Sequence, residues 1–342
     1  MLRARRRSLI LLRPEVVLGT NLLVAAVVLG WVLWRFGAPA LTILGAAPSW
    51  GLLAAFVAIA ALVMVVSTIR WRLVLAGLGH SPSVGVLLRY GLAGQSISLL
   101  VPSARLGGEP VRAFLLARDG VPAPVAIASV AVDRVLDMAS GTIFAMVFVA
   151  ALLRAGIPAL EGAFATVTVG SIALLLGIWM TVRRLQRRRG VLTAVARATR
   201  LDRLGIVERH MGVLAAAEED MARLIAQPGR MRQAFMLGVA TNLIILLEYY
   251  LLLHAFGLPT GPMAIVAALF GVAAAHSMPV PAGVGVLEGS QMFLFGVLGY
   301  PAEVGLAVGL AVRLRMLVWV LPGLVYLLAR RLAGTLVRER VT

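Results

Sequence analysis

Two stretches of the chain decide its fold. One reads SLLVPSARLGGEPVRAFLLARDGVPAPVAIASVAVDRVLDM and occupies Ser98–Met138, and the other reads PVPAGVGVLEGSQMFLFGVLGYPAEVGLAVGLAVRLRM and occupies Pro279–Met316. They align without a gap when the numbering is shifted by 179, so that Pro102 meets Pro281. From those prolines onward, ten of 37 aligned positions are identical. Such self-similarity at a fixed spacing predicts an internal repeat.

The identical positions include residue types that are rare in so apolar a chain. They comprise an acid, an arginine and a Gly-x-Pro turn in each copy, namely Glu109 and Glu288, Arg134 and Arg313, Gly120 and Gly299, and Pro122 and Pro301. Because charged and turn-forming residues coincide, we expect both copies to place a short helix, a turn and a long helix in the same order.

The composition places the chain in a membrane. Its 342 residues are 61% apolar and 14% charged, and the mean hydropathy is +0.95, whereas soluble domains are about 45–50% apolar and about 25% charged. The sequence has no cysteine and no lysine, which excludes disulfides, thiolate sites and Schiff-base chemistry. The four histidines lack metal-ligand spacing, so we expect neither a metal nor a cofactor.

Apolar runs of spanning length predict the transmembrane helices, since a span needs about 20 residues. The runs are Val16–Trp34, Trp50–Ile69, Pro124–Leu153, Phe164–Val182, Ala234–Phe256, Pro262–Val280 and Pro301–Ala329, with a weaker run at Val84–Val101. Two shorter, more polar segments, Pro102–Arg118 and Pro281–Leu298, are expected to be broken or re-entrant hairpins. The fold class is therefore an all-α polytopic membrane protein with seven to eight spans. A signal peptide is the alternative for the first run, which we expect to remain as an uncleaved span.

Arginines indicate the orientation of these spans. With the N-terminus inside, 25 of the 32 arginines fall on the inner side and two, Arg35 and Arg154, on the outer side. The positive-inside rule thus predicts cytoplasmic termini in a bacterial inner membrane. We divide the single membrane domain 1–342 into a first repeat at 50–153, a basic cytoplasmic segment at 183–233 and a second repeat at 234–329.

The cytoplasmic segment carries a helical stripe of apolar residues. Leu204, Val207, Met211 and Leu214 are spaced by three and four positions. We interpret the stripe as an amphipathic helix on an anionic membrane surface, and a docking helix for a partner is the alternative. The high positive charge is thus assigned to anionic lipid rather than to nucleic acid.

The arginine count also places the two repeats in opposite orientations, since it puts Pro122 on the inner side and Pro301 on the outer side. Inverted repeats with broken helices are typical of transporters that bind substrate near the bilayer midplane. Shared ancestry without a present function is the alternative.

Several charges are predicted at membrane depth, where each costs at least about 2.5–3.5 kcal/mol on insertion scales. They are Asp133, Arg134, Asp137, Glu248, Arg313 and Arg315. One interpretation is a set of salt bridges that lock helices together. The other is a polar cavity in which Arg134 and Arg313 hold an anionic headgroup, since the planar guanidinium suits phosphate. Asp133, Asp137 and Glu248 would then act in gating or proton transfer.

The hairpins supply a second device for binding anions. Gly107 and Gly108 in one, and Gly283 and Gly285 in the other, precede half-helices whose free N–H groups favour phosphate. Glu109 and Glu288 lie in the first turn of these half-helices. They either cap the N-terminus or act directly, as a proton carrier or a salt-bridge gate.

The two quoted stretches resemble the membrane region of lysylphosphatidylglycerol synthases and the wider group of flippase-like proteins, which includes small hopanoid-associated proteins. In the synthases this region is implied to move a modified phospholipid to the outer leaflet. The second motif usually reads Pro-x-Pro-Gly-Gly-x-Gly-x-x-Glu, and here Ala282 replaces its first glycine. Only residues 330–342 follow the last predicted span. We therefore expect no aminoacyl-transferase domain in this chain.

These observations predict a flippase or lipid-carrier transporter for an amphiphile with a charged headgroup, such as a phospholipid, a polyprenyl-phosphate-linked lipid or a hopanoid-type lipid. No catalytic residue is expected. The alternatives are a membrane-embedded enzyme that modifies a lipid headgroup, with Glu109 or Asp137 as base, and a non-catalytic partner of a lipid-synthesis enzyme.

Overall fold

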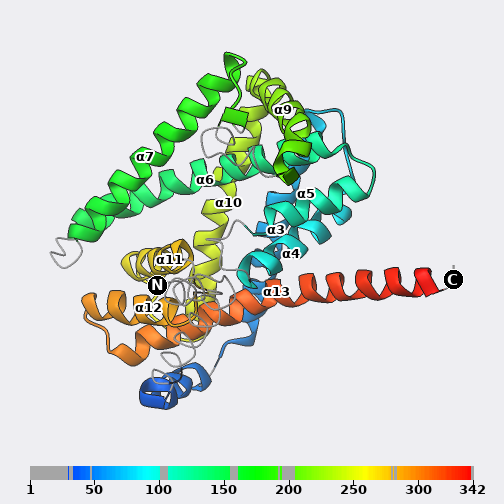
Figure 1. Ribbon diagram of the computed structural model, residues 1–342. Coiled ribbons are helices and arrows are strands. Elements are labelled where there is room, and N and C mark those ends of the chain that lie inside the picture. The colour runs from blue at the N-terminus through cyan, green and yellow to red at the C-terminus, as the bar shows by residue number, and fades with distance from the viewer. Residues whose placement is uncertain are drawn as a thin grey trace, which may run out of the picture. The chain divides into compact units, whose positions relative to one another are not determined.

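The structure is a computed structural model, and it describes residues 30, 34–46, 48–100, 107–154, 161–191, 193–194, 205–278, 280 and 283–339 (Figure 1). All regular secondary structure in these residues is helical, and none of them lies in a strand. The expected all-α, polytopic membrane architecture is confirmed. Most of the predicted first span, the start of both hairpins with Ala282, and Leu204 lie outside the described residues.

Five of the helices are long and apolar enough to cross a membrane, counted over the described ranges. They are α3 (Trp50–Ala76), α6 (Ala123–Arg154), α7 (Glu161–Gln186), α10 (Pro228–Ala255) and α13 (Ala302–Glu339). The shorter helices are α4 (Val84–Leu100), α5 (Glu109–Arg118), α11 (Pro262–Ser277), α12 (Val286–Val297) and α9 (Gly205–Ile225). The predicted spans therefore coincide with helices wherever the chain is described, although α4 and α11, with 17 and 16 residues, are shorter than a typical span.

The short helices α5 and α12 end in the same way, at a glycine in the left-handed region. Gly120 has φ of 95° and Gly299 has φ of 85°. The next residue reaches back to the helix in both cases: Val121 N donates to Leu116 O, and Tyr300 N donates to Phe295 O, at 3.3 and 3.0 Å. This is the C-terminal capping geometry that glycine permits, and a proline then directly precedes the long helix, which begins at Ala123 in one copy and at Ala302 in the other.

Helix boundaries match at the same shift of 179 that aligns the two sequences. At that shift α6 and α13 begin at equivalent residues, α3 and α10 end at equivalent residues, and α5 and α12 end at equivalent residues. The correspondence reaches beyond the two quoted stretches, because α3 and α10 share little sequence. We take it as support for a four-helix repeat, α3–α6 and α10–α13.

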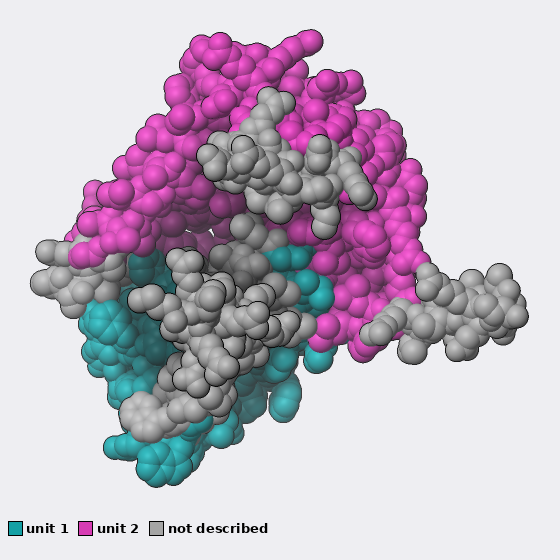
Figure 2. Space-filling view, viewed as in Figure 1, with its two compact units in different colours: residues 1–56, 95–108, 249–322 teal, residues 57–94, 109–248, 323–342 magenta. Residues whose placement is uncertain are grey.

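The chain forms two compact units (Figure 2). Unit 1 comprises residues 1–56, 95–108 and 249–322, and unit 2 comprises residues 57–94, 109–248 and 323–342. In unit 1, α12 packs against α11. In unit 2, α6 packs against α5, α7 and α9. The main apolar core of unit 2 is built on Trp71, Leu75, Leu87, Tyr90 and Leu116.

The helix predicted in the cytoplasmic segment is present as α9, and its most buried residues continue the predicted stripe toward the C-terminal end of the helix. Ala217, Met221 and Leu224 are buried, and Ala217 and Met221 pack in a cluster with residues of α6 and α7. Met211 and Leu214, from the predicted stripe, are only half-buried. The most buried face of α9 thus contacts protein, one to two turns further along the helix than the sequence pattern indicated.

Candidate functional site: two ion-pair systems

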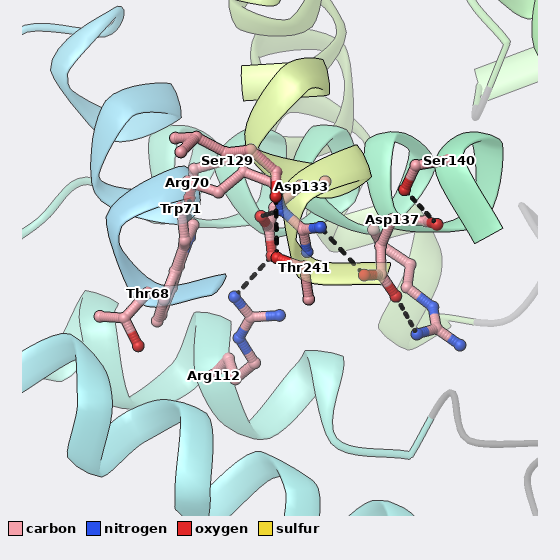
Figure 3. Close-up of polar contacts among 12 residues, drawn as sticks. Thr68, Arg70, Trp71, Arg112, Ser129, Asp133, Asp137, Ser140 and Thr241 are labelled. Atoms are coloured by element: carbon pink, nitrogen blue, oxygen red, sulfur yellow. Dashed lines mark hydrogen bonds and ion pairs between the residues drawn. The ribbon is translucent and has the colours of Figure 1, made fainter. Parts of the chain in front are cut away.

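Six charged side chains of unit 2 form one connected network across α3, α5 and α6. Figure 3 shows four of them, Arg70, Arg112, Asp133 and Asp137. Arg70 Nε donates to Asp133 Oδ1 at 2.9 Å, and Arg70 Nη1 donates to Asp137 Oδ1 at 3.0 Å. Arg112 Nη2 donates to Asp133 Oδ2 at 2.8 Å. Asp133 and Asp137 lie one turn apart on α6, so a single guanidinium can bridge them.

The network continues from Asp137 to the start of α5. Arg134 Nη1 donates to Asp137 Oδ2 at 3.3 Å, and Arg134 Nε lies 3.4 Å from Glu109 Oε1. Acids and arginines therefore alternate along the chain Glu109, Arg134, Asp137, Arg70, Asp133, Arg112. Three negative and three positive charges balance, which lowers the cost of keeping them at membrane depth.

The two ends of this network differ in burial and in bond length. The side chains of Arg70 and Asp133 are 4% and 3% exposed, while those of Arg134 and Asp137 are 25% and 39% exposed. The contacts of Arg134 are also longer than those of Arg70. Buried atoms without a hydrogen-bond partner occur at both ends within the described residues, namely Glu109 Oε2 and Arg134 Nε at one end and Arg112 Nε at the other. The Arg70–Asp133 end thus has the character of a structural lock, and the Arg134–Glu109 end that of an exchangeable ion pair.

An aromatic ring completes the buried end. The guanidinium carbon of Arg112 lies 4.0 Å from the centroid of the Trp71 ring, a cation–π contact. Trp71 is itself buried, and its Nε1 donates to Ser129 Oγ at 3.3 Å. Arg112 is therefore held between a carboxylate and an indole, which fixes α5 against α3 and α6.

Unit 1 contains a second ion pair at the positions equivalent to Glu109 and Arg134. Arg313 Nε donates to Glu288 Oε1 at 2.7 Å, and Arg313 Nη2 donates to Glu288 Oε2 at 3.1 Å. Arg313 Nη2 also donates to Gly283 O at 3.0 Å. This pair is bidentate and buried, with the Glu288 side chain 1% exposed.

Glu288 also caps its own helix. Gly285 N donates to Glu288 Oε2 at 2.9 Å, which is the acid's half of a capping box at the start of α12, since glycine has no side chain to accept a bond in return. Gly283 and Gly285 have φ of 58° and 79°, which residues with a side chain rarely adopt. Capping and ion pairing, which the sequence left as alternatives, thus coexist at Glu288.

The remaining predicted residues lie in the turn before α5 and in α10. Gly107 and Gly108 form the turn before α5, and Gly108 N donates to Ser98 Oγ at 2.8 Å. The N–H groups of Gly108 and Gly285 are therefore engaged by the chain's own oxygens in this conformation. Glu248 is fully buried in α10. The convergence of Arg134 and Arg313 on one headgroup stays a prediction.

Sequence reasoning missed Arg70, Arg112 and Trp71. Both arginines had been counted on the inner side, because Arg70 directly follows the run Trp50–Ile69 and Arg112 lies in the hairpin Pro102–Arg118. A usable signal existed: two acids one turn apart at membrane depth require cations from another helix, and Arg134 cannot satisfy both.

Within the described ranges, no group of three or more His, Cys, Asp or Glu side chains has the geometry of a metal site. The family model described as "Lysylphosphatidylglycerol synthase TM region" matches residues 19–323. The chain belongs to this family. The match covers the helices that carry both ion-pair systems, from α3 to most of α13.

Two curated proteins illustrate the similarity of this family member to archaeal sequences. A UPF0104 membrane protein of Methanothermobacter thermautotrophicus is 25% identical over 267 residues, which are 74% of this chain and 77% of that protein. A UPF0104 membrane protein of Methanocaldococcus jannaschii is 33% identical over 101 residues, which are 29% and 30% of the two chains. No solved structure matches the chain. The chain is therefore a multi-pass membrane protein of this family.

Proposed function

We propose that this protein transports a lipid with an anionic headgroup across the membrane. One observation carries the proposal: each of two equivalent positions in the chain holds a Glu–Arg pair beside a broken helix. The pairs are Glu109 with Arg134 and Glu288 with Arg313. If these positions served folding stability alone, apolar residues would stabilise the protein as much, because a buried ion pair rarely stabilises a fold more than apolar residues of similar volume do.

The two ion pairs differ in how easily a substrate phosphate can replace the glutamate at the arginine, and transport requires such an exchange. Arg134 has longer contacts and is partly exposed, so a phosphate oxygen can replace Glu109 with little loss of interaction. Arg313 is held by three short contacts and resists replacement in this conformation. In a transporter with alternating access we expect the two pairs to exchange these roles, one open while the other is closed.

Orientation and compartment belong to the same proposal. Both termini face the cytoplasm of an inner membrane, and the two repeats have opposite orientations. The concentration of arginines on one predicted side supports this arrangement.

A reconstitution experiment tests the function. The purified protein is inserted into vesicles containing fluorescently labelled phosphatidylglycerol in both leaflets, and dithionite is added outside to quench accessible label. The transport proposal predicts quenching of inner-leaflet label with the protein and only outer-leaflet quenching in empty vesicles. Labelled diacylglycerol, which lacks the anionic group, measures permeation that does not depend on the protein.

If vesicles with and without the protein quench to the same extent for every anionic lipid tested, the transport proposal is wrong. Release of a chemically altered lipid, detected by mass spectrometry, would instead indicate a lipid-modifying enzyme.

A further inference from the structure

Unit 1 contains a small cavity whose lining includes neither Glu288 nor Arg313. It has a volume of about 20 Å³ and is lined by two turns of α4 and two turns of α13, namely by Gln95, Ser98, Leu99, Arg315, Met316, Trp319 and Val320. All of these residues belong to unit 1. A cavity of this size holds about one water-sized group.

The helix α13 directs its two membrane-depth arginines differently. Arg313 and Arg315 are two positions apart, which places them about 200° apart around a helix. Arg313 contacts Glu288 and Gly283, whereas Arg315 borders the cavity and lies 5.1 Å from the centroid of the Tyr249 ring. The aromatic ring offsets part of the cost of the charge.

The lining suits an anion. Arg315, Gln95, Ser98 and Trp319 all carry N–H or O–H donors, and none of the seven described lining residues is acidic. Leu99, Met316 and Val320 supply apolar walls, in which a charge-assisted hydrogen bond is stronger than in water.

The walls of the cavity are fixed in place. Ser96 Oγ donates to Val320 O at 2.8 Å and joins α4 to α13 beside the cavity. Ser98 Oγ accepts the N–H of Gly108, which ties the same face of α4 to the turn of the first hairpin.

The charged and amide side chains of the cavity are not repeated in the sequence. At the shift of 179, Arg315 corresponds to Leu136 and Gln95 corresponds to Ala274. The donor set of this cavity is therefore specific to the pairing of α4 with α13.

We propose that this cavity is a subsite for a phosphate oxygen, with Arg315 as the charged ligand and the Gln95 amide and Trp319 indole N–H as further donors. The cavity admits one oxygen, so the rest of the headgroup stays outside it. This subsite rests on the proposed lipid transport and names a phosphate mono- or diester as the recognised chemistry. The phosphate comes either from a lipid headgroup or from solution.

Equilibrium binding tests the subsite without requiring transport. The full protein is reconstituted in nanodiscs, and retained lipid is counted by native mass spectrometry with phosphatidylglycerol or diacylglycerol supplied. We expect Arg315→Gln to weaken phosphatidylglycerol binding at least tenfold and to leave diacylglycerol binding unchanged. Arg315→Lys should recover only part of the loss, because the planar fork is absent. Leu317→Ala, on the exposed face of the same helix, is the matched control.

Two uncharged changes keep the test decisive if Arg315→Gln does not fold. Trp319→Phe and Gln95→Leu each remove one neutral donor and should weaken binding roughly fivefold, which corresponds to about 1 kcal/mol. Wild-type binding in Arg315→Gln, or in both uncharged variants, overturns the subsite.

Inorganic phosphate distinguishes the two sources. Thermal stabilisation by phosphate alone that disappears in Arg315→Gln, without any retention of phosphatidylglycerol, would support the phosphate site and contradict a lipid source. Arg315-dependent binding of phosphatidylglycerol in a protein that does not translocate it would uphold the subsite and contradict the transport function.

Discussion

Asp133→Asn is the change that should damage the fold of this protein most clearly. Asp133 is 2% exposed and accepts hydrogen bonds from Arg70 at 2.9 Å and Arg112 at 2.8 Å. Asparagine keeps the shape but removes the charge, and its NH₂ group faces one of the two guanidinium donors. Arg70, with a side chain 4% exposed, would retain only Asp137 as its carboxylate partner within the described network.

The expected magnitude follows from that burial. Removing one partner of a buried ion pair costs about 3–5 kcal/mol, because the remaining charge stays desolvated. Arg134→Ala removes a side chain that is 25% exposed and whose two ion-pair distances are 3.4 and 3.3 Å. Its loss should be at most about 1 kcal/mol, the range of partly exposed pairs. The two variants therefore separate the structural lock from the exchangeable pair.

Equilibrium unfolding in detergent micelles, followed by tryptophan fluorescence, measures both free energies. Arg232→Ala, at an exposed arginine, serves as the control for loss of positive charge. An Asp133→Asn protein that loses less than about 1 kcal/mol would refute the assignment of Asp133 as a lock. A loss in Arg134→Ala as large as that in Asp133→Asn would refute the distinction between the two ends of the network.

Three further predictions use the same helices. Glu288→Gln should lower the free energy of unfolding by about 3–5 kcal/mol, since it breaks a buried bidentate pair. Glu109→Gln should lower it by at most about 1 kcal/mol. Equal losses of the two variants in chemical denaturation would contradict the difference in burial between the two pairs. Because the chain has no native cysteine, Ala123→Cys and Tyr300→Cys can be labelled singly in sealed vesicles. The inverted arrangement predicts labelling from opposite sides, and labelling of both from one side would contradict it. Gly299→Ala should cost about 1–2 kcal/mol because the residue has a φ of 85°, and an unchanged unfolding midpoint would argue against that conformation.

The fold could be read from the sequence because its signals are local. Apolar runs predicted α3, α6, α7, α10 and α13, and the Gly-x-Pro turns at Gly120 and Gly299 predicted where the long helices begin. Each signal depends on residues a few positions apart, and the helix is the structure that satisfies the backbone in lipid.

The site could be read only in part, because its contacts are distant in sequence. The charged residues at Asp133, Asp137 and Arg134 were evident, but Arg70 and Asp133 are separated by 63 positions. Composition and spacing do not indicate which arginine at the end of an apolar run turns inward. For a similar reason the apolar stripe of α9 did not indicate that its C-terminal part packs on α6 and α7, because those contacts are distant in sequence.

The central claim is that the arginine of each Glu–Arg pair serves lipid translocation, and the dithionite assay on Arg134→Ala and Arg313→Ala tests it most directly. Both variants should insert in the membrane and should fail to move labelled phosphatidylglycerol, while Arg232→Ala moves it at the wild-type rate. Arg→Lys at either position should restore little, because bidentate contact with phosphate is lost. Translocation at the wild-type rate in both alanine variants, or failure of both to insert, would contradict the account.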